Sequence, residues 1–199
     1  MSGPLDRLTS GLPAPWDTIV DWAVTIAIAV AAVLAIKAWV VNPYRIPSSS
    51  MEPTLHCAAP EPGCQAESSD RVLANRFIYR FRDPERGDIV VFETPERAIA
   101  RCGAGGTFVK RLVGLPGDRI VMTRGVLSVN GQPVDEPYVN GGPSGPDFAE
   151  RTLGADEYFM MGDNRGQSCD SREWGPVNRD DLIGPVFAVY WPLTRLGLR

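Results

Sequence analysis

Side chains that can act as a base near neutral pH are scarce in this sequence. The chain has 199 residues and one histidine, His56, and only Lys37 and Lys110 among its 20 basic residues are lysines. Arginine stays protonated at any working pH, whereas a desolvated lysine can release its proton. A general base in this protein therefore comes from a very short list.

Several familiar motifs are also missing. A single histidine excludes HExxH and any multi-histidine metal site, and the sequence has no CxxC, GxSxG or GxxxxGK motif. The net charge of −4 argues against broad nucleic-acid binding, which needs a basic face. A Ser-His-Asp triad would have to use His56, which we interpret instead as a solvated loop histidine.

One long apolar segment lies near the N-terminus. Residues 19–41 read IVDWAVTIAIAVAAVLAIKAWVV, with Asp21 and Lys37 near the two ends. Such a run is long enough to cross a bilayer as a helix, and aromatic residues flank both of its ends. A buried helix of a soluble domain and a cleaved signal peptide are the alternatives. The strand-rich remainder offers no helical partner, and no small-x-small site follows the run, so we predict a retained transmembrane anchor.

The rest of the chain, residues 42–199, has the composition of one globular domain. The 20 glycines and 18 prolines of the whole chain indicate many turns, and short apolar runs rich in branched residues recur between turn signals. These runs cover residues 71–79, 88–92, 108–113, 119–122, 158–161 and 183–190. Residues 126–129, followed by Asn130-Gly131, predict one arm of a tight hairpin. Residues 141–147 predict a loop. We predict a mainly β domain with antiparallel sheets.

A serine cluster and an isolated lysine suggest chemistry. Ser48, Ser49 and Ser50 follow the predicted anchor, and Lys110 lies within the apolar run 108–113. Apolar neighbours would strip water from the amine and lower its pKa, as a serine–lysine nucleophile–base pair requires. A serine-rich turn and a solvated lysine on a strand are the alternatives.

Four segments in order sharpen this interpretation: SSSMEPTL (48–55), RGDIVVF (86–92), KRLVGLPGD (110–118) and GDNRxxSxDSRxxG (162–175). Together they resemble the successive sequence boxes of bacterial type I signal peptidases, which lie behind an N-terminal anchor. The resemblance implies an all-β catalytic domain that cuts signal peptides from exported preproteins. It also implies that no metal, nucleotide or other cofactor takes part.

The resemblance implies catalytic and structural roles for individual residues. By matching position, Ser50 is the nucleophile and Lys110 the general base. Ser48 and the Ser50 backbone N–H form the oxyanion hole, and Ser168 orients the lysine amine. Three further residues resemble a structural ionic cluster: Arg111, Asp170 and Arg172. The pockets for the small side chains of an Ala-x-Ala pattern would be lined by Ile46, Pro47, Met51, Leu55, Val91, Phe108 and Val109.

The four cysteines lie in the part of the chain that the resemblance places outside the cytoplasm, where oxidation can occur. Cys57 and Cys64 flank a Pro/Gly loop, while Cys102 precedes the lysine segment and Cys169 follows Ser168. We predict the disulfides Cys57–Cys64 and Cys102–Cys169. Four cysteines allow three pairings, and free buried thiols are the remaining alternative.

The resemblance also implies an orientation that the flanking charges do not set. Residues 1–18 would form a cytoplasmic tail, 19–41 a single-pass anchor in the lipid of the cytoplasmic membrane, and 42–199 the extracytoplasmic peptidase domain.

Two other functions are alternatives to a signal peptidase. A self-cleaving Ser/Lys repressor protease would need a helical DNA-binding domain that residues 1–41 cannot supply, and a membrane-anchored binding module would not depend on Ser50.

Overall fold

The computed structural model describes residues 16–39, 41–139, 142 and 144–199. The chain divides into two units, Met1–Val41 and Asn42–Arg199, and each is described by itself. Most of the predicted cytoplasmic tail, residues 1–15, lies outside the described residues.

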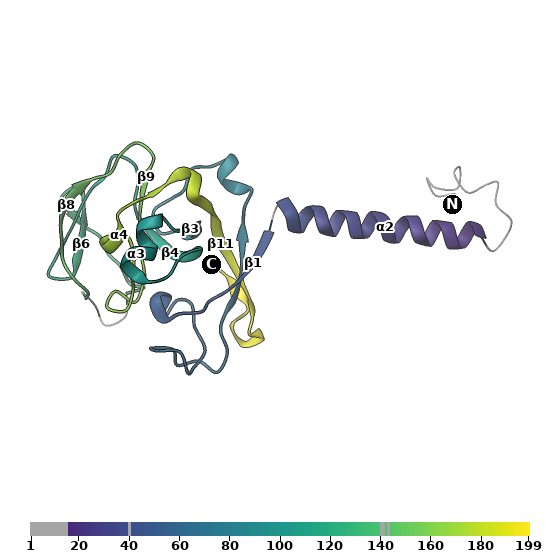
Figure 1. Cartoon of the computed structure of the whole chain (residues 1–199), viewed down its shortest axis with the longest axis horizontal. Coiled ribbons are helices and arrows are strands. Elements are labelled where there is room, and N and C mark those ends of the chain that lie inside the picture. Colours follow the sequence, from purple (N-terminus) through teal and green to yellow (C-terminus); the bar gives the residue numbers. More distant parts are fainter. Residues whose placement is uncertain (1–15, 40, 140–141, 143) are drawn as a thin grey trace. The chain divides into compact units, whose positions relative to one another are not determined.

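The first unit contains helix α2, Trp16–Trp39 (Figure 1). This segment has no glycine or proline, so nothing in it interrupts the backbone hydrogen bonds of a helix. Large apolar side chains of the helix, among them Ile19, Trp22 and Val33, are more than half exposed. Within the described residues, no helix combines the length and apolar character needed to cross a membrane. The anchor over residues 19–41 stays a prediction.

The second unit is built on a large sheet. Its strands are β1 (Val41–Arg45), β2 (Arg71–Asn75), β3 (Ile89–Glu93), β4 (Thr107–Gly114), β9 (Glu157–Met161), β10 (Val177–Asn178), β11 (Leu182–Trp191) and β12 (Gly197–Leu198). The order is β1-β2-β11-β3-β4-β9-β10, and β12 pairs with β11. The pairs from β2 to β10 are antiparallel, as predicted. Strand β4 thus lies inside the sheet, between β3 and β9.

A smaller antiparallel sheet contains β5 (Arg119–Thr123), β6 (Val126–Val129), β7 (Gln132–Pro133) and β8 (Phe148–Thr152), in the order β7-β6-β5-β8. Figure 1 shows β6 and β8 together at one end of this unit. Asn130 and Gly131 turn the chain from β6 to β7 with φ of 53° and 80°, the left-handed backbone that a two-residue hairpin turn needs. Asparagine and glycine adopt this conformation at little cost, so the predicted hairpin is present.

Short helices occupy several of the connections. They are η1 (Ser49–Met51), η2 (Ile78–Arg80), α3 (Glu96–Cys102), α4 (Ser171–Trp174), η3 (Arg179–Asp181) and η4 (Leu193–Arg195). The predicted strand over 71–79 is too long. The Asn75 side chain accepts the backbone N–H groups of Phe77 and Ile78, which turns the chain out of the sheet after Asn75.

The core of this unit is contributed mainly by the central strands. Phe92 on β3, Leu112 on β4, and Phe159 and Met160 on β9 are fully buried. Each side chain of this size stabilises the fold by about 1.5–3 kcal/mol relative to an exposed position. The catalytic candidate Lys110, on β4, is therefore attached to a buried part of the unit.

Two disulfides fasten loops to this core. Cys57–Cys64 closes a loop of sequence separation 7, and Cys102–Cys169 joins positions 67 residues apart. The second bond connects the last residue of α3 with the segment that leads into α4. It therefore restrains both short helices against the end of the sheet.

We predict that the long-range disulfide contributes more stability than the local one. In the chain-entropy model a closed loop of this size is worth about 4 kcal/mol, against about 2.5 kcal/mol for the shorter loop. The unfolding free energy should fall by more in the Cys102→Ala/Cys169→Ala variant than in Cys57→Ala/Cys64→Ala, measured by urea denaturation. An unchanged midpoint when the wild-type chain is reduced would contradict the prediction.

Candidate active site

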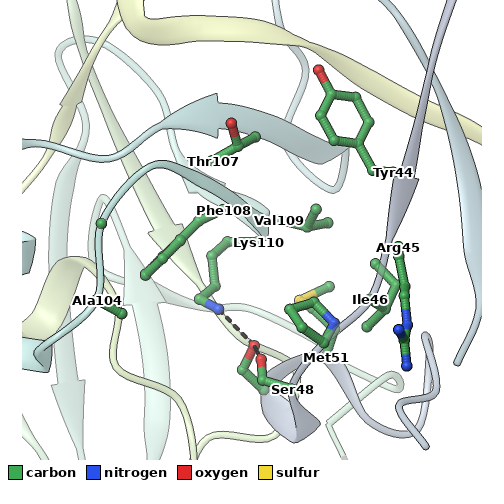
Figure 2. Close-up of a pocket in the computed structure, with 13 residues that line it drawn as sticks. Tyr44, Arg45, Ile46, Ser48, Met51, Ala104, Thr107, Phe108, Val109 and Lys110 are labelled. Carbon is green, nitrogen blue, oxygen red and sulfur yellow. Dashed lines mark hydrogen bonds between the residues drawn. The ribbon is translucent and has the colours of Figure 1, made fainter.

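The Lys110 amine and the Ser50 hydroxyl meet in the second unit, although 60 positions separate them in the sequence. Lys110 Nζ donates to Ser50 Oγ at 2.6 Å. Figure 2 shows Lys110 extending from its strand to the serine oxygens. Lys110 is 4% exposed and Ser50 is 7% exposed, so the contact is shielded from bulk water.

Burial changes the acidity of this lysine. Desolvation disfavours the ammonium form and lowers the pKa of Lys110 to about 8, with a smaller contribution from Arg172. The carboxylates of Asp170 and Asp163 act in the opposite direction and favour the ammonium. The ring of Phe108 lies 5.3 Å from Nζ and takes the place of water on one side. A large neutral fraction of the amine is therefore present at mildly alkaline pH.

The three consecutive serines have different surroundings. Ser48 Oγ lies 3.3 Å from Ser50 Oγ, so it faces the same site. Ser49 is turned elsewhere: its hydroxyl donates to the Pro62 carbonyl and to the Gln167 side chain, each at 3.0 Å. The short helix η1 produces this separation, because consecutive residues of a helix point in different directions.

Ser168 lies beside the site without the contact that the resemblance implied. Its hydroxyl is buried and has no hydrogen-bond partner in the described part of the chain, so the structure has no Ser168–Lys110 hydrogen bond. Gly162 explains how Ser168 approaches Ser50. A Cβ on Gly162 would lie within 3.0 Å of both the Ser168 hydroxyl and the Ser50 carbonyl oxygen. A glycine is needed at this position because the segments that contain Ser50 and Ser168 both lie against its backbone.

The expected ionic cluster is divided into two buried pairs. Arg172 Nε donates to Asp170 at 2.8 Å, and Asp170 also accepts the Gly162 N–H. Arg111 pairs instead with Asp163, at 2.8 Å and 2.6 Å. All three predicted residues of the ionic cluster thus form buried ion pairs, and the carboxylate that faces Arg111 is Asp163, which the prediction did not include.

Asp163 connects three parts of the chain and was missed by the sequence analysis. Its carboxylate accepts the Thr54 hydroxyl at 2.5 Å in addition to the Arg111 guanidinium. Arg111 also donates to the Gly87 carbonyl and lies 3.9 Å from the Tyr138 ring centroid. Asp163 could have been found from its place in the fourth family-like segment, residues 162–175. Within that segment, the sequence analysis gave roles only to Ser168, Asp170 and Arg172.

A cavity of about 330 Å³ opens beside Lys110 and Ser50. Five of the predicted pocket residues line it, namely Ile46, Pro47, Met51, Phe108 and Val109. The sequence analysis missed Tyr44, Arg45, Ala104, Gly105 and Thr107, which also line it. Leu55 and Val91 do not, and their assignment is corrected: both are fully buried in the core. Figure 2 shows Phe108 and Arg45 on different sides of the lysine.

The chemistry available here is that of a nucleophile with an adjacent base. A neutral amine at hydrogen-bond distance can remove the hydroxyl proton, and the hydroxyl then attacks a carbonyl carbon placed in the cavity. Among the described residues, no group of three or more histidine, cysteine, aspartate or glutamate side chains could hold a metal ion.

Comparisons with known proteins identify the family of this chain. The family model "Signal peptidase, peptidase S26" matches residues 19–191. A probable signal peptidase I-2 from Synechocystis sp. is 38% identical over 184 residues, which cover 92% of this chain and 78% of the relative. A signal peptidase I from Leptolyngbya laminosa is 37% identical over 177 residues, 87% of this chain and 80% of the relative. A crystal structure of a signal peptidase I from Enterococcus faecalis aligns with a TM-score of 0.44 at 29% identity, over 52% of this chain and 97% of that one. The chain belongs to the signal peptidase family, peptidase S26.

Proposed function

We propose that this chain is a serine endopeptidase that removes N-terminal signal peptides from exported preproteins. The observation that carries the proposal is the 2.6 Å hydrogen bond between the buried Lys110 amine and the Ser50 hydroxyl. Family membership supplies the substrate class, and the shielded Ser–Lys contact supplies the chemistry.

In the proposed reaction, neutral Lys110 accepts the Ser50 hydroxyl proton while Oγ attacks the scissile carbonyl carbon. The developing oxyanion accepts hydrogen bonds from the Ser48 hydroxyl and the Ser50 backbone N–H, donors that act only as the charge forms. The Lys110 ammonium then protonates the amine of the departing mature protein. Water attacks the remaining ester with Lys110 again as base, which releases the signal peptide and restores Ser50.

The cavity beside the dyad is the proposed binding site for the residues that precede the cut. Strand β1 and the start of β4 contribute Tyr44, Arg45 and Thr107 to its wall. An extended peptide alongside these strands would form main-chain hydrogen bonds, with side chains entering shallow pockets. We propose that small residues occupy those pockets, in the Ala-x-Ala pattern that the family resemblance implies.

We also propose that residues 19–41 attach the enzyme to the cytoplasmic membrane, with residues 42–199 on the extracytoplasmic side. The support is the long apolar run with charges only near its ends, together with the exposed apolar side chains of α2. This placement would bring the dyad to the face of the membrane where preproteins emerge.

Removing either member of the dyad should abolish cleavage. The full chain in uncharged detergent with lipid is incubated with a preprotein carrying Ala-x-Ala, and the product N-terminus is sequenced. Ser50→Ala removes the nucleophile, and Lys110→Arg replaces the base with a group that cannot lose its proton. We expect turnover to fall by roughly 10⁴-fold or more in both variants.

Ser49→Ala is the matched control, because it removes a neighbouring hydroxyl that faces Pro62 and Gln167. It should retain turnover to within about threefold, given that it loses only neutral hydrogen bonds. Full activity in Ser50→Ala would favour a binding module, and activity in Lys110→Arg would require another base.

The pH dependence should follow Lys110. With a pKa of about 8, the amine is protonated and inactive as a base at lower pH. We expect kcat/KM for a non-titrating peptide to rise about tenfold per pH unit up to pH 8 and then level off. A profile that stays flat from pH 6 to 9 would show that Lys110 does not supply the base.

Gly162 should be required for the position of Ser50. In Gly162→Ala the new Cβ meets the Ser50 carbonyl and the Ser168 hydroxyl, so the backbone at residue 50 or at residue 162 must shift. We expect kcat/KM to fall at least tenfold, since small displacements of reacting groups are costly. Gly166→Ala is the control, as its Cβ would meet nothing within 4 Å. Thermal unfolding identifies the folded samples, and equal activity in both folded variants would contradict the prediction.

A further inference from the structure

A second hollow, of about 390 Å³, lies apart from the active-site cavity and shares no lining residue with it. Its wall contains four arginines: Arg97 and Arg101 from α3, Arg151 from β8 and Arg172 from α4. We call it the arginine hollow. The concentration of positive charge is unusual for a chain whose net charge is −4.

Three of the four arginines form no ion pair within the described part of the chain, although the Arg151 guanidinium lies 5.5 Å from the Phe159 ring centroid. Asp170 neutralises Arg172, so the three without an ion pair among the described residues are Arg97, Arg101 and Arg151. Glu173 is the one acidic residue on the wall. Like charges gathered around one hollow repel one another, and an anion among them would relieve that repulsion.

The wall also contains buried donors that lack an acceptor. Trp174 is 2% exposed, and its Nε1 has no hydrogen-bond partner in the described part of the chain. Arg172 Nη1 lacks one as well, on the side that approaches Gly145. A buried donor left unpaired costs about 1–3 kcal/mol. Both donors are enclosed, so an acceptor group that entered the hollow would reach them only if the wall side chains moved.

Covalent and packing restraints hold the walls in place. The Cys102–Cys169 disulfide joins the end of α3 to the segment before α4. Trp174 packs edge-on against Phe108, with ring centroids 5.6 Å apart. These restraints fix the backbone that carries the arginines, while the exposed side chains of Arg97 and Arg101 would still become ordered on binding.

We propose that the arginine hollow binds a phosphate group, supplied either by the headgroup of an anionic phospholipid or by free phosphate. The planar guanidinium fork matches phosphate oxygens in bidentate pairs. Several such forks around one hollow suit an anion with more than one charge better than a lone carboxylate. This proposal is independent of the peptidase reaction.

The test uses the full chain in uncharged detergent micelles. Inorganic phosphate is titrated in one arm, and micelles doped with phosphatidylglycerol or, as reference, phosphatidylcholine are used in the other. Tryptophan fluorescence reports binding, because Trp174 lines the hollow, and calorimetry checks it. Arg97→Gln/Arg101→Gln/Arg151→Gln is compared with the control Arg71→Gln/Arg76→Gln/Arg119→Gln, which changes the net charge equally at exposed positions outside the hollow.

We expect at least tenfold weaker binding in the hollow variant, less than threefold in the control, and weaker binding in both wild-type arms as salt rises. Binding of phosphate alone would identify free phosphate as sufficient, and binding only of phosphatidylglycerol would identify the lipid headgroup. No binding in either arm, or equal losses in the two triple variants, would overturn the proposal. If the hollow variant unfolds, the single variant Arg101→Glu is compared with Arg76→Glu in the same binding assay, with the same expected difference.

Discussion

The burial of one lysine amine is the constraint on which the site depends. Lys110 can act as a base only if its ammonium form is disfavoured, and desolvation on an interior strand does this. Lowering its pKa from 10.5 to about 8 costs the folded state about 3 kcal/mol wherever both states are protonated, below pH 8. The cost disappears as pH rises from about 8 through 10.5, because the unfolded chain binds more protons in that window. The packed core around β4 offsets this cost at neutral pH.

The two nearby carboxylates must not pair directly with Lys110, because an ion pair would raise its pKa again. Asp163 and Asp170 both favour its ammonium form. Each is held instead by an arginine, Arg111 or Arg172, through short hydrogen bonds. These pairs also connect the serine segment, β4 and the segment after β9, since Asp163 accepts from Thr54 and Asp170 from the Gly162 backbone. One set of charges thus both restricts the electrostatic effect on Lys110 and fixes the backbone around Ser50.

The sequence predicted the longer apolar strands, but it did not predict the short strands or the contacts that depend on strand register. The serine cluster and the isolated lysine are rare features of this composition, and the family resemblance then assigned the roles to Ser50 and Lys110. Val91 and Val109 look alike in sequence and are paired across β3 and β4, yet only Val109 reaches the cavity while Val91 is fully buried. The choice of Asp163 as the partner of Arg111 likewise depends on how distant segments meet. Strand β8, with the sequence FAERT, has no apolar run that could have revealed it.

The connection between β3 and β4 contributes to the active-site cavity and to the arginine hollow. Helix α3 supplies Arg97 and Arg101 to the arginine hollow, and the loop that follows it supplies Ala104 and Gly105 to the active-site cavity. The disulfide at Cys102 is placed between these two contributions. On the other side, Trp174 lines the hollow and packs against Phe108, which lines the cavity and lies over the lysine amine. An anion in the hollow would therefore lie against α3, which leads into the cavity wall, and against Trp174, which packs on that wall, so the two sites share their supporting structure.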